Sequence, residues 1–151
     1  MSDRDRYQLG KVMEEVMIEA QATAARMACT RMTALDLSAL HDSVQRACCL
    51  AGRSEWHRKA AAHAEFLSLL ADMAADPVLA PLQRGAAGYM REVMLGVGRA
   101  ADGMIVSSRR RLLAHLRAGN GEAAELEMET HLRGLLYMWR LSHMGSKATV
   151  R

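Results

Sequence analysis

The sequence predicts an all-α fold, an antiparallel bundle of about six helices. Ala, Leu, Met, Glu and Arg, which are all good helix formers, are abundant in the chain. Long strings of β-branched residues are absent, and there are only two Trp, three Tyr and one Phe. Short groups of turn and cap residues divide the chain into six apolar-periodic segments. A length of 151 residues suits one well-buried domain and is short for two.

Helix-start and helix-stop residues give the expected element boundaries. Thr33 and Asp36 have the spacing of a capping box at the start of the second helix. Asp76 followed by Pro77 indicates a helix start there or slightly later, near Pro81. Asn120, after Gly119, is expected to cap the last helix. The predicted helices span residues 7–31, 34–50, 55–75, 77–97, 105–118 and 121–143. Gly52 and Ser54 are expected to separate the second and third helices, and Gly96, Gly98, Asp102 and Gly103 to mark a loop between the fourth and fifth.

We expect one all-α domain over residues 1–145 and a frayed C-terminal tail over 146–151. No repeat or low-complexity stretch divides it. The sequence has no apolar run long enough to span a membrane and no signal-peptide pattern. Its formal net charge of +3 neither requires nor excludes a nucleic-acid partner.

The cysteine pattern favours a reducing compartment. Cys29, Cys48 and Cys49 are an odd set with no metal-ligand spacing, so we expect reduced thiols in a cytoplasmic protein. An exposed Cys48 or Cys49 acting as a redox sensor is an alternative.

The main functional signal is a group of polar residues expected at one depth of the bundle. Arg109 and His131 interrupt the apolar faces of two helices that meet at Gly119, at nearly equal distances from that turn. Counting back similarly from the other turns at the same end of the bundle reaches three more residues. The expected layer therefore contains Gln21, His63, Tyr89, Arg109 and His131. Five hydrogen-bonding residues at one depth predict a buried polar pocket.

Arg109 indicates which ligand that pocket would bind. Helical periodicity places Arg109 on the face that also carries Ile105 and Leu112, not with the neighbouring arginines. A buried guanidinium needs a partner, and a ligand carboxylate or phosphate would provide one. The alternative is an internal acid, such as Glu65 or Glu92, that reaches inward.

Three segments in order resemble the FCD domain, the all-helical effector-binding domain named after the C-terminal part of FadR, found in GntR-type transcriptional regulators. The first segment is MACTRMT, from Met27 to Thr33. The second is HAEFLSLLADMAADP, from His63 to Pro77, and the third is RRRLLAHLRAGN followed by EAAELEMETHL, from Arg109 to Leu132. The resemblance covers about residues 10–140. It implies a homodimer that binds a small-molecule effector.

Many members of that family hold a divalent metal with one Asp and three His, and the resemblance places those ligands at His63, Leu67, Arg109 and His131. Leu67 has no donor atom, and Arg109 is a permanent cation. Two plausible ligands are fewer than even an open zinc site uses. We therefore expect no tightly held metal and no other cofactor, with His63 and His131 as the fallback metal candidates.

The resemblance also implies a winged helix-turn-helix before the sensor, and this chain begins without one. It is either a piece of a longer regulator or a stand-alone sensor, and we expect DNA binding only through that separate domain. The expected function is to sense a small anionic metabolite, of organic or fatty acid type. Arg109 would bind the acid group, His131 and His63 would form hydrogen bonds, and Gln21 and Tyr89 would tune specificity.

Three other interpretations stay open at this point. One is a metal sensor that uses His63 and His131, and another is a purely structural dimerisation module. An enzyme is disfavoured, because no nucleophile–base pair and no paired carboxylates on one helix face stand out.

Overall fold

The computed structural model describes residues 1–50 and 55–149, and side chains up to His143. In these residues the chain forms six α-helices and one short 3₁₀ helix, and no strand. The helices are α1 (Asp3–Arg31), α2 (Ala34–Cys49), α3 (Trp56–Ala74), α4 (Ala80–Val97), α5 (Asp102–Arg117) and α6 (Gly121–Thr149), with η1 (Arg99–Ala101) before α5. The predicted all-α bundle is confirmed.

Side-chain caps explain where three of the helices begin. Thr33 and Asp36 form the predicted reciprocal capping box at the start of α2. Asn120 caps α6 by accepting a hydrogen bond from the backbone N–H of Ala123 at 3.1 Å. Ser2 and Asp5 form a second capping box, so α1 begins at Asp3, four residues before the predicted start.

Of two expected boundaries, one is confirmed and one is wrong. Asp76 caps a single turn through its bonds to the backbone N–H groups of Val78 and Leu79, and α4 begins at Ala80, which agrees with the later of the predicted starts, near Pro81. Asp102 and Gly103 lie inside α5 and not in a loop, because the chain reverses in fewer residues than expected. Gly98, at φ 83°, makes the break, and η1 follows it directly.

Two sequence predictions lie partly or wholly outside the described residues. The separators Gly52 and Ser54 fall in the stretch 51–54, outside them. The backbone of α6 is helical to Thr149, beyond the predicted end of the last helix, and fraying over 146–151 stays a prediction.

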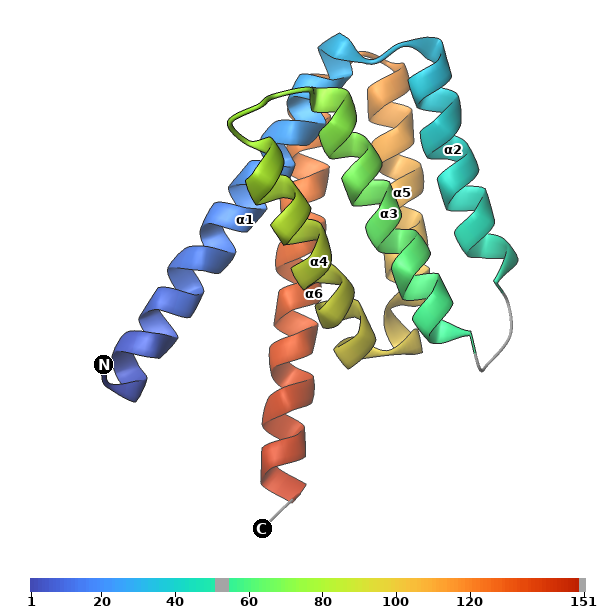
Figure 1. The fold of residues 1–151 in the computed structure, drawn as a ribbon. Helices are drawn as coiled ribbons and strands as arrows, with labels where there is room; N and C mark the ends of the chain where they lie inside the picture. The colour runs from blue at the N-terminus through green and yellow to red at the C-terminus, as the bar shows by residue number, and fades with distance from the viewer. Residues whose placement is uncertain (51–54, 150–151) are drawn as a thin grey trace.

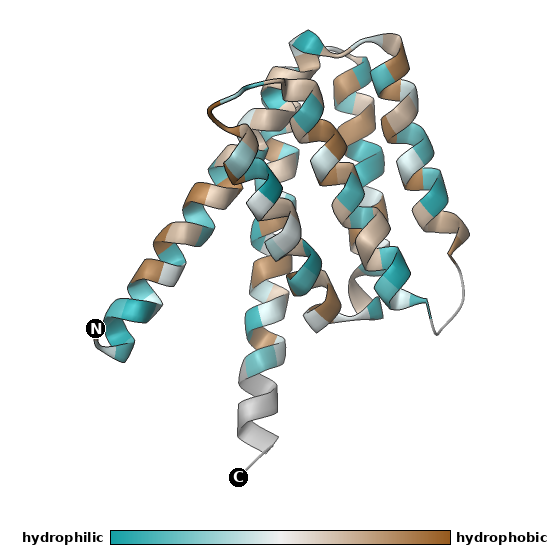
Figure 2. Ribbon diagram, in the orientation of Figure 1, coloured by the Kyte–Doolittle hydropathy of each residue, from teal (hydrophilic) through white to brown (hydrophobic). Residues whose placement is uncertain are grey.

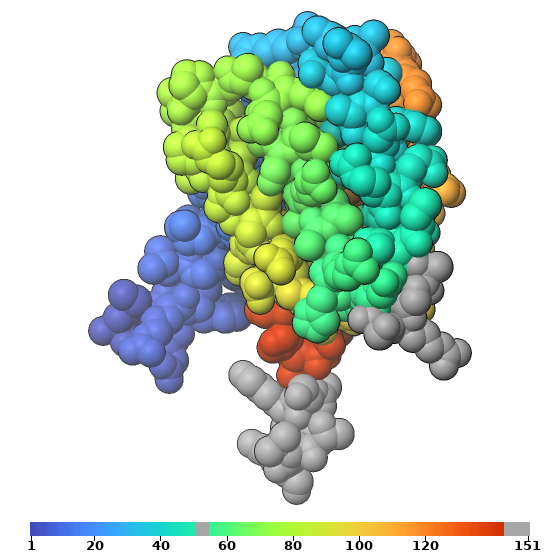
Figure 3. All heavy atoms as spheres, turned by 45° about the vertical axis from the view of Figure 1, so that its right-hand side comes forward, coloured from blue at the N-terminus to red at the C-terminus, as the bar shows by residue number. Residues whose placement is uncertain are grey.

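The helices are arranged with the α1–α2, α3–α4 and α5–α6 connections at one end of the bundle (Figure 1). Buried small residues, Ala24, Ala25 and Ala28, let the C-terminal half of α1 pack closely on α3 and α6. The N-terminal half of α1 instead projects from the body (Figures 1 and 3). Apolar segments recur along that projecting half (Figure 2), where Leu9, Val12 and Met13 are each at least 50% exposed.

Candidate functional site

The candidate site is built around Arg109, whose side chain is enclosed in the middle of the bundle. It is only 1% exposed, and it lies on α5 between the apolar residues Ile105 and Leu112. One guanidinium nitrogen, Nη2, donates a hydrogen bond to the backbone carbonyl of His63 at 3.4 Å. The guanidinium carbon lies 4.7 Å from the centre of the Phe66 ring, a cation–π contact.

Arg109 has no ion-pair partner among the described residues. Its Nε and Nη1 atoms are buried without a hydrogen-bond acceptor there. The internal acids considered from the sequence lie elsewhere: Glu65 is 3.5 Å from Arg46 at the surface, and Glu92 is exposed. Glu127 is the one acid whose charge favours the guanidinium, and it is paired with Arg111.

Burial also sets the charge state of Arg109. Loss of hydration lowers the pKa of Arg109 from 12.5 to about 9, which the charge of Glu127 only partly opposes. The guanidinium is therefore still a cation at neutral pH, but a destabilised one. A group of this kind is stabilised by any anion that reaches it.

His131, on α6, faces the same interior. It is 5% exposed, and neither ring nitrogen has a hydrogen-bond partner among the described residues. Burial lowers the pKa of His131 well below its usual range, and the charge of Arg109 adds to that effect. The imidazole is therefore neutral at pH 7 and offers one donor and one acceptor to a ligand.

His63, on α3, connects Arg109 to the edge of the bundle. Its backbone carbonyl accepts from Arg109, while its ring Nε2 lies 3.0 Å from Oδ1 of Asp102. Because a carboxylate only accepts, Nε2 carries the proton in this contact. Burial lowers the pKa of His63 to about 4 although Asp102 acts in the opposite direction, so His63 is neutral as well.

Asp102 was not predicted as a site residue. Its second oxygen, Oδ2, lies 2.7 Å from the ammonium of Lys59. Partial burial acts to raise the pKa of Asp102, but the hydrogen bonds from Lys59 and His63 outweigh it and the pKa is lowered. A sequence signal did exist, since Asp102, Ile105 and Arg109 have the i, i+3, i+7 spacing of one helix face.

The other two predicted site residues have different partners. Gln21 donates through Nε2 to the carbonyl of Gln83 at 3.0 Å and ties α1 to α4, while its Oε1 has no partner among the described residues. Tyr89 donates to Glu14 at 3.0 Å, and burial with that bond raises the pKa of Tyr89 to about 12. The structure thus groups Arg109, His63 and His131, and it adds Asp102 and Lys59.

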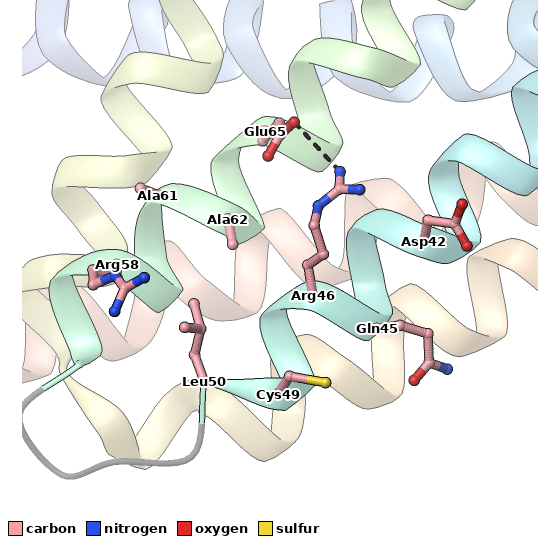
Figure 4. Close-up of a pocket in the computed structure, with 9 residues that line it drawn as sticks. All are labelled: Asp42, Gln45, Arg46, Cys49, Leu50, Arg58, Ala61, Ala62 and Glu65. Carbon is pink, nitrogen blue, oxygen red and sulfur yellow. Dashed lines mark hydrogen bonds and ion pairs between the residues drawn. The ribbon is translucent and has the colours of Figure 1, made fainter.

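One small cavity lies inside the bundle, where Gln21, Met90 and Leu132 are among its lining residues, and two others lie nearer the surface. The smaller of these two, of about 230 Å³, adjoins the Asp102 contact and is lined by Leu50, Trp56, Lys59, Arg99, Ala100 and Asp102. A larger and more open groove, of about 840 Å³, lies between α2 and α3 (Figure 4). Arg46 reaches across that groove to Glu65, and no predicted site residue lines it. The larger hollow is therefore not where the buried polar groups meet.

The metal positions implied by the resemblance do not fit a metal. Leu67 is fully buried and has no donor atom, and the Arg109 cation stands beside His63. Within the described residues, no group of three or more His, Cys, Asp or Glu side chains is placed to hold an ion. No chemistry is therefore assigned to a metal here.

Comparison with protein families gives one match, the FCD domain, over residues 14–134. Comparison with curated proteins and with solved structures gives no match. None of the described helices is long and apolar enough to cross a membrane. FCD is a family of regulatory rather than catalytic domains. The chain belongs to the FCD domain family, the C-terminal effector-binding and oligomerisation domains of GntR-type transcriptional regulators.

Proposed function

We propose that this chain senses a small organic acid whose carboxylate binds the Arg109 guanidinium. The observation that carries the proposal is a fully buried cation with two nitrogens that lack any acceptor among the described residues. Leaving such donors unpaired costs free energy, and a bound carboxylate would recover it through charge-assisted hydrogen bonds. The rings of His131 and His63 would then orient the rest of the ligand through hydrogen bonds.

Binding at this position requires the bundle to move. Arg109 is enclosed, so a ligand reaches it only if α3 and α5 separate near His63 and Asp102. The ligand would favour the open arrangement by its difference in affinity for the two states, and by no more. In a longer regulator, such a shift would change the spacing of two DNA-binding heads. Since transcription regulators act where the DNA is, we place the proposed sensor in the cytoplasm.

The proposal includes a homodimer formed through the projecting half of α1. Leu9, Val12, Met13 and Val16 leave an apolar stripe exposed there. A second copy could bury this stripe, and oligomerisation is a property of the family. Light scattering of the purified protein tests this part, with Val12→Glu expected to give a monomer.

The experiment for the sensor is a thermal-shift and calorimetric screen of small carboxylates. A binding acid should raise the melting temperature of the wild type and leave that of Arg109→Met unchanged. Arg109→Lys retains the charge but loses the planar fork, so it should bind the same acid more weakly. An acid that stabilises the wild type and Arg109→Met equally would refute the role of Arg109.

A purely structural module is the second candidate. The observation that favours it is the tight enclosure of Arg109 with the Phe66 contact and the His63 bond already in place. If no acid in the screen changes the melting temperature of the wild type, this second function is preferred.

A further inference from the structure

The cavity of about 230 Å³ beside Asp102 has a charge pattern that the proposed Arg109 site does not account for. Two cationic side chains, Lys59 and Arg99, line it together with the single carboxylate of Asp102. Lys59 is already paired with Asp102 at 2.7 Å. Arg99 is exposed and has no ion pair among the described residues. The side chains that line the cavity therefore have a net charge of +1, because Asp102 neutralises only one of the two cations.

Only one residue separates this cavity from the proposed Arg109 site. The Asp102 carboxylate forms a wall of the cavity and contacts the ring of His63, and the carbonyl of the same His63 accepts from Arg109. Trp56, another wall residue, lies with its ring centre 6.5 Å from that of His63. The cavity is therefore the surface opening that leads most directly to the guanidinium.

Asp102, at the cavity, and Arg109, in the interior, lie at the two ends of one face of α5. Asp102 and Arg109 are seven residues apart on α5, about 10 Å along the helix axis and nearly in line. A ligand that enters at the cavity and reaches Arg109 runs along this face. Its outer end stays beside Lys59 and Arg99, where a second negative group would be stabilised.

We propose, resting on the proposed carboxylate sensor, that the effector is a dicarboxylate whose outer acid group binds Lys59 and Arg99. Asp102 is then an internal carboxylate that holds Lys59 and His63 while no ligand is bound. The outer acid group of the ligand takes the place of Asp102 at Lys59, which frees the start of α5 to move away from α3. This contact links binding in the cavity to the opening that Arg109 requires.

The test compares acids that differ only in the second carboxylate, succinate with butyrate and adipate with hexanoate, by calorimetry at constant ionic strength. The wild type should bind at least one dicarboxylate about tenfold or more tightly than its monocarboxylate partner. Lys59→Met and Arg99→Gln should each reduce that preference. Arg91→Gln, which removes an exposed cation on α4, is the matched control and should retain it. Because Arg99 is exposed, Arg99→Gln keeps the test valid if Lys59→Met does not fold.

The outcomes separate this inference from the function on which it rests. Equal binding of both acids, lost in Arg109→Met, would overturn the dicarboxylate inference and leave the carboxylate sensor intact. Dicarboxylate binding that depends on Arg99 but not on Arg109 would establish the outer site and refute the role of Arg109. Binding of none of the acids would overturn both.

Discussion

Replacing Arg109 with Met is expected to make the ligand-free protein more stable, contrary to the usual effect of changing a buried residue. The fall in the pKa of Arg109 from 12.5 to about 9 corresponds to about 5 kcal/mol of destabilisation of the charged form. The cation–π contact with Phe66 returns about 2 kcal/mol, and the long bond to the His63 carbonyl returns about 1 kcal/mol. The net cost of the cation is then about 2 kcal/mol.

Met has a similar length, fills irregular space well and needs no hydrogen-bond partner. We therefore expect Arg109→Met to raise the free energy of unfolding by about 1–4 kcal/mol, the range seen when unfavourable buried charges are replaced by apolar residues. For a chain of this size, each kcal/mol corresponds to about 2–4 °C in melting temperature.

The assay is urea unfolding at pH 7, followed by circular dichroism, on protein refolded from denaturant so that any bound acid is removed. Arg110→Met is the matched control, since Arg110 is exposed on the same helix and its replacement should change stability by less than about 0.5 kcal/mol. A loss of about 3–5 kcal/mol in Arg109→Met would refute the reasoning, because it would show that the guanidinium has a strong internal partner such as Glu127.

Three further predictions concern pH, packing and metal. The pKa of His63 is 6.5 in the unfolded chain and about 4 in the fold, so the unfolded state binds more protons between these values. The free energy of unfolding should therefore fall by at least about 3 kcal/mol as the pH drops from 6.5 to 4, because His131, whose pKa is also lowered by burial, adds to the fall from His63. A flat profile in urea titrations would contradict the burial of both histidines. Gly96→Ala should lower the melting temperature, because its new Cβ would lie 2.9 Å from the Trp139 ring. Gly88→Ala, with open space around it, should instead raise the free energy of unfolding in urea by about 0.5–1 kcal/mol. Equal effects of the two substitutions on stability would exclude the contact between Gly96 and Trp139. Dialysis against a chelator should leave the melting temperature unchanged, and a fall would make His63 and His131 metal ligands after all.

The sequence predicted the helices well where local chemistry sets their ends. The Thr33–Asp36 box and the Asn120 cap are side-chain contacts within four residues, and both form as expected. The start of α5 was predicted too late, because there the packing of the core and not the local sequence sets the helix end. Asp102 and Gly103 favour turns locally, but the reversal is completed by Gly98 and η1, and packing of Ala101 and Ile105 in the core keeps the next residues helical.

The candidate site was predictable only in part, because counting residues from the turns assumes helices that run straight and parallel. That assumption is adequate for α3, α5 and α6, which bring His63, Arg109 and His131 to one interior region. It fails for Tyr89, whose ring lies 6.5 Å from that of Trp139, eight residues or about 12 Å beyond His131 on α6. The roles of Gln21 and Tyr89 in ligand binding stay predictions.

Stability and sensing are opposed in the proposed mechanism, and the opposition follows from a single side chain. A buried cation without an acceptor lowers the stability of the closed bundle, so the closed and open arrangements lie closer in free energy than they would with an apolar residue at position 109. A carboxylate that reaches Arg109 recovers the lost hydrogen bonds only in the open, liganded state, and this difference in affinity is what can shift the population. The Arg109→Met protein should therefore be more stable and also unable to respond.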